Sequence, residues 1–295
     1  MKEITINSYD EIVRLIENIT KDAELLKAGG FGYYFRGQAN KDWRLLPGLL
    51  RKLALNEIDE MKSIPNINKK DKSFISLAVA QHYDKSTRCL DFTRNFNIAL
   101  FFACNPEYPC FNSDGALFVL EKEFHKPAWF TNYLMYYTAT NPDNDVSSWE
   151  YANYLSKIPE IESEFIRTGR STALDSYNSE TQVYLSRGFL VDFKDNDLGF
   201  ERIKRQEAAL FYFGSKFYEI NDKNEKIYIS TDYLTTYWSS QNSFRIEPHN
   251  IVDANLEEFC PYKIIIPQHV KQEIFDRINI TKSDLELEDT KEKAT

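Results

Sequence analysis

An aromatic run that ends in a short polar block constrains the fold of this chain more than any other feature. Residues 31–35 read Phe-Gly-Tyr-Tyr-Phe, and Arg36, Gly37 and Gln38 follow directly. Aromatic residues favour β-strands, so Arg36 is predicted to stand on a stiff strand. Gly37 has no Cβ, which permits either a sharp turn or close approach to a ligand. The block predicts an anion or nucleotide site; the alternative is an arginine that locks a turn by pairing with a buried acid.

A second polar block begins at Gln81. The sequence reads Gln-His-Tyr over residues 81–83 and Thr-Arg-Cys-Leu-Asp over residues 87–91. Residues 73–82 are predicted to form a helix that carries His82 at its C-terminal end, where the ring could instead bond the last carbonyls. Asp91 could pair with Arg88 or cap the next helix, and Cys89 is expected to be a packing residue.

These blocks resemble the FRG domain family, which is named for its Phe-Arg-Gly triplet. Further matching segments occur in family order between residues 33 and 283: Trp43, Leu46-Pro47, Arg51, Ala80, Thr93, Ala99-Leu100, Asp114–Ala116, Arg205-Gln206 and Ile264–Pro267. We therefore expect one FRG-like domain over residues 1–282, with a poorly matched insertion at about residues 121–199. A charged tail, expected to be disordered, covers residues 283–295.

The spacing of the polar blocks is also similar to that of ADP-ribosyltransferases, whose split sheet holds NAD in a cleft. This resemblance implies NAD as the substrate, with catalytic roles for Arg36, Gln206 and Glu207. It implies that the cofactor-binding residues are Arg36, Gln38, His82, Tyr83, Thr87, Arg88 and Asp91. A carboxylate at Glu207 would stabilise the positive charge that develops on the ribose when nicotinamide leaves. Gln206 is the better matched position in the FRG family, and Glu207 could be a solvated residue at the start of a strand.

Two classes of function therefore stay open. The first is an NAD-dependent ADP-ribosyltransferase or NAD glycohydrolase, expected in a toxin or phage-defence setting with a macromolecular target and an inhibitor or antitoxin partner. The second is a non-catalytic module that senses a nucleotide or binds a protein. A nuclease is disfavoured because the sequence has no acidic cluster with metal-ligand spacing. No metal is expected, since the histidines and cysteines also lack ligand spacing.

Composition narrows the partners and the compartment. The 295 residues carry a formal net charge of −9, which argues against non-specific binding to nucleic acid or to an anionic membrane. A local basic cleft built from Arg36, Arg88 and Arg205 would be compatible with this charge. Four cysteines without paired spacing, no apolar stretch of spanning length and no signal-peptide pattern predict a cytoplasmic protein.

The order of the predicted elements favours an α+β fold. Helices are expected at residues 9–27, 46–55, 97–104 and 268–279, in addition to residues 73–82, with helical pieces at about 150–167. Strands are expected to carry Arg36 and to cover residues 116–120, 207–213 and 262–266. Because strands and helices do not alternate regularly, an α+β fold is favoured over a doubly wound sheet. Residues 121–199 are expected to elaborate the core of a single large domain. The ADP-ribosyltransferase resemblance implies a split, mainly antiparallel sheet around a cleft, with helices packed on it.

Overall fold

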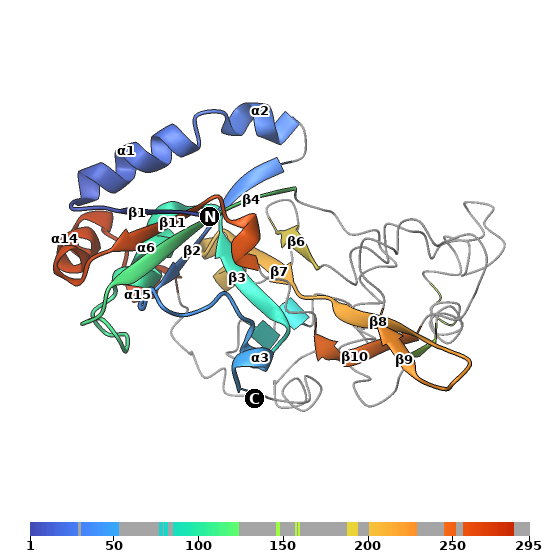
Figure 1. Ribbon diagram of the computed structural model, residues 1–295. Helices are drawn as coiled ribbons and strands as arrows, with labels where there is room; N and C mark the ends of the chain where they lie inside the picture. Colours follow the sequence, from blue (N-terminus) through green and yellow to red (C-terminus); the bar gives the residue numbers. More distant parts are fainter. Residues whose placement is uncertain are drawn as a thin grey trace, which may run out of the picture.

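A computed structural model describes the fold over the greater part of the chain. It describes residues 1–28, 31–52, 77–78, 80–81, 85–123, 146–147, 157, 159, 188–193, 201–228, 245–251 and 256–285. Two β-sheets with helices packed around the larger one make up the described part (Figure 1). The prediction of an α+β fold with a mainly antiparallel sheet is confirmed.

The larger sheet has seven strands in the order β1-β11-β4-β2-β3-β7-β6. Its strands are β1 (Lys2–Thr5), β2 (Phe31–Gln38), β3 (Cys89–Thr93), β4 (Gly115–Glu123), β6 (Phe189–Asp192), β7 (Ala208–Tyr212) and β11 (Tyr262–Ile266). The pair β1–β11 is parallel, and the other neighbouring pairs are antiparallel. A strand from the start of the chain therefore pairs with a strand from near the end of the described residues, at one edge of the sheet.

The smaller sheet has four strands in the order β5-β10-β8-β9 and lies beside the larger one (Figure 1). Its strands are β5 (Val146–Ser147), β8 (Ser215–Ile220), β9 (Lys226–Tyr228) and β10 (Arg245–Ile251). Strand β8 follows β7 after two residues, so the chain passes directly from one sheet to the other.

Both faces of the larger sheet are buried over its centre. On β4, Leu117 and Val119 belong to one apolar cluster, while Ala116, Phe118 and Leu120 belong to a second. Side chains alternate between the two faces of a strand, so a strand buried on both faces needs a continuous apolar run. The run Ala-Leu-Phe-Val-Leu at residues 116–120 meets this requirement.

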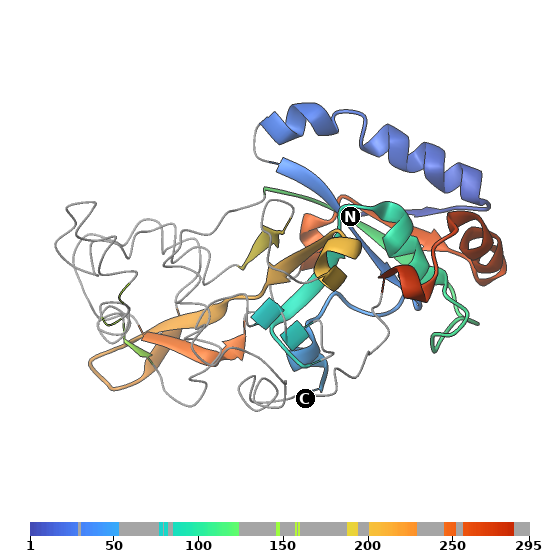
Figure 2. The same cartoon turned by 180° about the vertical axis from the view of Figure 1, so that it is seen from behind.

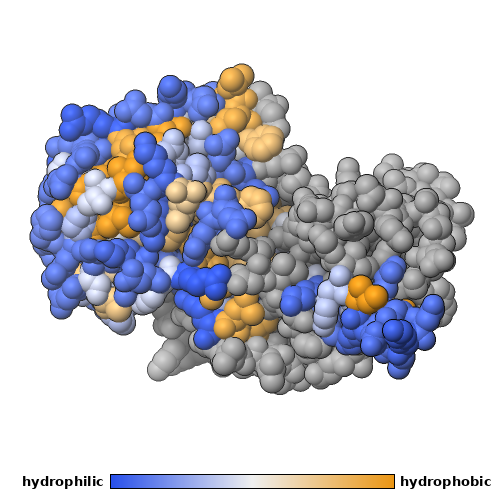
Figure 3. Space-filling model, viewed as in Figure 1, coloured by the Kyte–Doolittle hydropathy of each residue, from blue (hydrophilic) through white to orange (hydrophobic). Residues whose placement is uncertain are grey.

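Helices cover the first of these two faces. They are α1 (Tyr9–Ile19), α2 (Ala23–Ala28), α6 (Phe96–Cys104), α14 (Gln268–Ile278) and α15 (Lys282–Leu285). Shorter elements are α3 (Gly48–Lys52), α12 (Glu201–Arg205) and the 3-10 helix η1 (Leu256–Phe259). The outer surface of the described part is mainly hydrophilic in the view of Figure 3.

Most of the predicted elements that fall on described residues are found, and two differ. The helix predicted at residues 9–27 is divided, because Thr20 caps α1 and its hydroxyl donates to the carbonyl of Ile16 at 2.9 Å. The prediction of a disordered tail from residue 283 is wrong for residues 283–285, which belong to α15. Thr281 caps this helix by donating its amide to the Asp284 carboxylate at 2.8 Å, and Leu285 is 3% exposed.

The predicted insertion at residues 121–199 and the helical pieces at 150–167 fall largely outside the described residues. So do most of the helix predicted at residues 73–82 and the end of the one predicted at 46–55. No helix of the described part is long and apolar enough to cross a membrane.

Candidate functional site

The larger sheet opens between β2 and β3. Strand β2 pairs with β4 along its whole length, but it pairs with β3 at one position, Phe35 with Thr93. Beyond this pair the guanidinium of Arg36 spans the opening, and its Nη1 donates to the backbone carbonyl of Asp91 at 2.7 Å. A side chain thus replaces the strand ladder here, which leaves space between the two strands.

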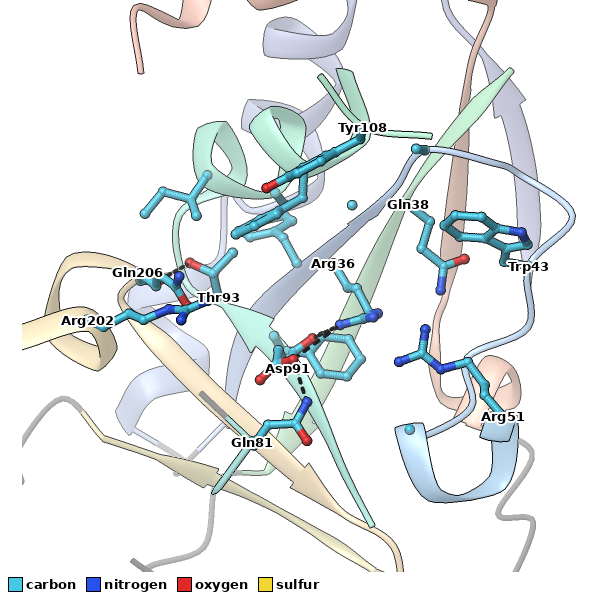
Figure 4. Close-up of a pocket in the computed structure, with 18 of the residues that line it drawn as sticks. Arg36, Gln38, Trp43, Arg51, Gln81, Asp91, Thr93, Tyr108, Arg202 and Gln206 are labelled. Atoms are coloured by element: carbon cyan, nitrogen blue, oxygen red, sulfur yellow. Dashed lines mark hydrogen bonds and ion pairs between the residues drawn. The ribbon is translucent and has the colours of Figure 1, made fainter. Parts of the chain in front are cut away.

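A cavity of about 580 Å³ occupies this opening. Its size is within the range of about 300–1,000 Å³ that is usual for small-molecule sites. The described residues that line it come from β2, β3, α3, α6, α12 and α15 and from the loops beside them. In Figure 4, Arg36 and Asp91 lie at the centre, Gln38, Trp43 and Arg51 on one side, and Thr93, Arg202 and Gln206 on the other.

The cavity lining is strongly cationic. Among the described residues that line it, five are basic and one, Asp91, is acidic. The basic residues are Arg36, Arg51, Lys85, Arg202 and Lys282. In a chain with a net charge of −9, this local excess of positive charge marks a site for an anionic ligand.

Arg36 combines burial with an unused donor. Its side chain is 16% exposed, and its Nε is buried without a hydrogen-bond partner among the described residues. Burial lowers the pKa of Arg36 to about 10, against the opposing influence of Asp91, whose Oδ2 lies 4.0 Å from Nη1. At neutral pH the guanidinium is still charged, so Arg36 can bind an anion inside the cavity.

A hydrogen-bonded chain holds the Asp91 carboxylate in place. Gln81 Nε2 donates to Asp91 Oδ2 at 2.8 Å, and Thr87 Oγ1 donates to Gln81 Oε1 at 2.5 Å. Thr87 is fully buried and does not line the cavity, whereas the Asp91 side chain is 41% exposed. Thr87 therefore acts on the site through Gln81 and not by direct contact with a ligand.

Gly37 serves the packing of a helix against the sheet. A Cβ at this position would lie 1.7 Å from the carbonyl oxygen of Ala99, so no other residue fits without moving α6. The sequence suggested a turn or an approach to a ligand, but Gly37 lies inside β2 and the close neighbour is the backbone of α6. The Phe-Arg-Gly triplet thus joins a core residue, a cavity cation and a helix contact.

The structure brings some of the predicted site residues together and separates others. Arg36, Gln38, Asp91 and Gln206 all line the cavity. Arg88 does not: it is 1% exposed, donates to Ser215 Oγ at 2.9 Å and lies over the ring of Tyr212. It connects β3 to the start of the smaller sheet. His82 and Tyr83 lie outside the described residues.

Glu207 also lies apart from the cavity lining. Its Oε1 accepts a hydrogen bond from Asn95 Nδ2 at 2.9 Å, and Asn95 is the N-cap of α6. The backbone of Glu207 adopts a φ of 44°, in the left-handed region, where α12 turns into β7. The carboxylate therefore fixes a turn and a helix cap, while its neighbour Gln206 faces the cavity.

Several cavity residues were not predicted from the sequence. Arg202 lines the cavity in place of Arg205, which donates to the carbonyl of Ser283 at 3.3 Å. Trp43, expected to be a packing residue, is 44% exposed and lines the cavity. The spacing of Arg202 and Gln206, four residues apart, places them on one face of a helical turn and was the available signal.

The far wall of the cavity comes from the end of the described chain. Lys282 of α15 lines the cavity, and α15 lies beside α12 when the molecule is seen from behind (Figure 2). Tyr108 and Phe102, whose rings stack with centroids 6.2 Å apart, form an aromatic part of the lining. Within the described residues there is no group of three or more histidine, cysteine or acidic residues that could hold a metal ion.

Comparison with protein families finds a match over part of the chain. Residues 32–109 match the family model of the FRG domain. The match includes β2, α3, β3 and α6, which form most of the cavity, whereas Arg202, Gln206 and Lys282 lie outside it. Neither the curated proteins nor the solved structures include a significant match to the chain.

Proposed function

We propose that the chain binds NAD in the cavity between β2 and β3 and acts on it as an ADP-ribosyltransferase or NAD glycohydrolase. The observation that carries this proposal is the concentration of five basic side chains around one cavity of a chain with a net charge of −9. A pyrophosphate is the part of NAD that such a lining would bind.

Arg36 is the residue to which we assign the pyrophosphate. Its guanidinium lies at the centre of the cavity and keeps a buried Nε–H without a partner among the described residues. The aromatic rings of Trp43 and Tyr108 lie on different sides of Arg36 and offer stacking surfaces for the two bases of a dinucleotide (Figure 4). Gln38 and Gln206 supply amide groups that can orient the ligand.

Asp91 is the carboxylate that we assign to the chemistry. When the glycosidic bond breaks, its electron pair leaves with nicotinamide and positive charge develops on the ribose. A water molecule or an acceptor group then bonds to the same carbon and loses a proton. Asp91 is the only carboxylate among the described lining residues, and its negative charge would stabilise the positive charge on the ribose. This places on Asp91 the role that the sequence suggested for Glu207.

Nicotinamide release from NAD by the purified protein tests the proposal. We expect release with the wild-type chain, measured with and without cell lysate as a source of acceptors. Asp91→Asn should lower turnover by roughly 100-fold with little change in NAD affinity, since a charge that acts on the transition state affects kcat. Glu207→Gln is the matched control and should retain turnover. An inactive Glu207→Gln with an active Asp91→Asn would return the role to Glu207.

A non-catalytic binding module is the second candidate function. It is favoured by the contacts of Asp91, whose carboxylate accepts from Gln81 and lies 4.0 Å from the Arg36 guanidinium, so part of its charge is already compensated. NAD binding without nicotinamide release would support this candidate. The proposed role as a toxin or phage-defence protein, with a macromolecular target and an inhibitory partner, applies only to the enzymatic candidate.

A further inference from the structure

Buried polar atoms without partners gather at the end of the cavity next to α3. Gln38 is 5% exposed and Ser86 is 1% exposed, and both line the cavity. Gln38 Oε1, Ser86 Oγ and Arg36 Nε have no hydrogen-bond partner within the described part of the chain. A buried polar atom left unpaired costs about 1–3 kcal/mol, so these atoms indicate groups of a ligand that bond to them. Arg36 Nε–H and the Ser86 hydroxyl can donate to an acceptor on the ligand, whereas Gln38 does so only through its NH₂ group, once the amide is turned.

Positive charge is present at the same end. Arg51 lies on α3, beside Gln38 and Trp43 in Figure 4, and Lys85 precedes Ser86 in the chain. Ser86 packs against the first residue of α3, since a Cβ at Gly48 would lie 3.4 Å from its Cα. Neither Arg51 nor Lys85 forms an ion pair with any residue that the structure describes.

One pyrophosphate does not use all of these groups. If it lies against Arg36 at the centre, the α3 end is left with the cations Arg51 and Lys85 and with the hydroxyl of Ser86. NAD has no other anionic group to offer them, and its nicotinamide ring is itself positive. A phosphate monoester would complete this end, because it carries nearly two negative charges and three acceptor oxygens.

We propose that the α3 end of the cavity, formed by Gln38, Arg51, Lys85 and Ser86, is a subsite for a phosphate monoester. The preferred ligand is then a dinucleotide with an additional phosphate, such as NADP, in place of NAD. Arg51 can bind the phosphate through two parallel hydrogen bonds, and the Ser86 hydroxyl can donate to one of its oxygens. The side-chain amide of Gln38 can turn to present its NH₂ group. This inference rests on the proposed binding of a dinucleotide.

Calorimetric titration of the full chain with NAD and with NADP tests the inference. We expect NADP to bind about tenfold more tightly or better, which matches the roughly 1.4 kcal/mol of one charge-assisted contact. Arg51→Gln and Ser86→Ala should each weaken NADP binding more than NAD binding, so that the ratio of the two affinities falls toward one. Arg14→Gln, at an exposed arginine of α1, is the matched control and should change neither affinity.

The outcomes separate this inference from the proposed function. Equal affinities for NAD and NADP, or an Arg51→Gln variant that weakens both by the same factor, would overturn the subsite but keep the dinucleotide proposal. Failure of both dinucleotides to bind would overturn both. Inorganic phosphate is the third probe: if it binds in an Arg51-dependent way while NADP has no advantage over NAD, the subsite takes free phosphate and the inference is wrong.

Discussion

At the scale of single residues, Gly37 shows how the Phe-Arg-Gly triplet combines helix packing with the lining of the cavity. Both of its neighbours in the triplet line the cavity, but Phe35 is also buried in the apolar core, whereas Arg36 carries a charge. Side chains alternate along a strand, and Gly37 follows Arg36 at the point where α6 crosses β2. Close contact between helix and strand fixes the strand that carries Arg36, and Gly37 itself also lines the cavity.

Gly37→Ala should destabilise the fold strongly. The added methyl group would meet the Ala99 carbonyl at 1.7 Å, and backbone atoms of a buried helix cannot move aside cheaply. We expect a loss of about 3 kcal/mol or more in the free energy of unfolding, measured by urea denaturation. Gly48→Ala is the control, since its Cβ meets Ser86 at an ordinary 3.4 Å. Equal stability of the two variants would refute the close packing of α6 on β2.

Arg36→Lys should distinguish the role of this side chain in ligand binding from its role in linking β2 to β3. Lysine keeps the charge but loses the planar fork and the Nε donor. NAD affinity should fall about tenfold, and the free energy of unfolding by only about 1 kcal/mol, the usual net value of one hydrogen bond. Titration and denaturation of the same preparation measure both. A large loss of stability with unchanged affinity would show that Arg36 is a structural link between β2 and β3.

At the scale of elements, the positions of the strands could be predicted from the sequence, but the pairing of distant strands could not. Continuous apolar runs such as residues 116–120 identify strands buried on both faces, and the structure contains them. The pairing of β1 with β11 joins residues more than 250 positions apart, which no local pattern encodes. At the site, Arg36, Gln38, Asp91 and Gln206 were predicted from local motifs, whereas Lys282 reaches the cavity only through the packing of α15.

Leu285→Ala tests whether α15 is an integral part of the domain. Leu285 is 3% exposed and packs in the same apolar cluster as α6 and α14. Truncating such a leucine costs about 2–5 kcal/mol. The displaced helix should also weaken NAD binding, because Lys282 lines the cavity. Leu25→Ala on α2 is the control, since Leu25 is 77% exposed. If both leucine variants unfold at the same urea concentration as the wild-type chain, α15 is a dispensable appendage.

At the scale of the whole molecule, the reactivity of the cysteines tests whether the apolar clusters on both faces of the larger sheet are packed. Cys89, Cys104 and Cys260 are fully buried, and Cys110 is half-buried. Burial raises the pKa of Cys104 and of Cys260 to about 12, so these thiols stay protonated and unreactive at neutral pH. Iodoacetamide should therefore modify Cys110 first in the native chain and all four cysteines in urea, as read by mass spectrometry. Early labelling of Cys104 would contradict the packing of α6.

The distribution of charge over the molecule predicts which anions it can bind. The net charge of −9 repels a polyanion that must approach along an extended surface, while the basic cavity can still admit a small ligand. Binding of random-sequence duplex DNA should be undetectable up to about 100 µM protein at about 0.15 M salt, because non-specific affinity comes from many phosphate contacts. NAD, measured in the same buffer, should bind.

Fluorescence anisotropy of a labelled duplex measures DNA binding, and Arg51→Gln is the control for binding that depends on the cavity. Salt-sensitive, micromolar binding of DNA that persists in Arg51→Gln would show a basic surface separate from the cavity and would overturn the assignment of the chain to small anionic ligands.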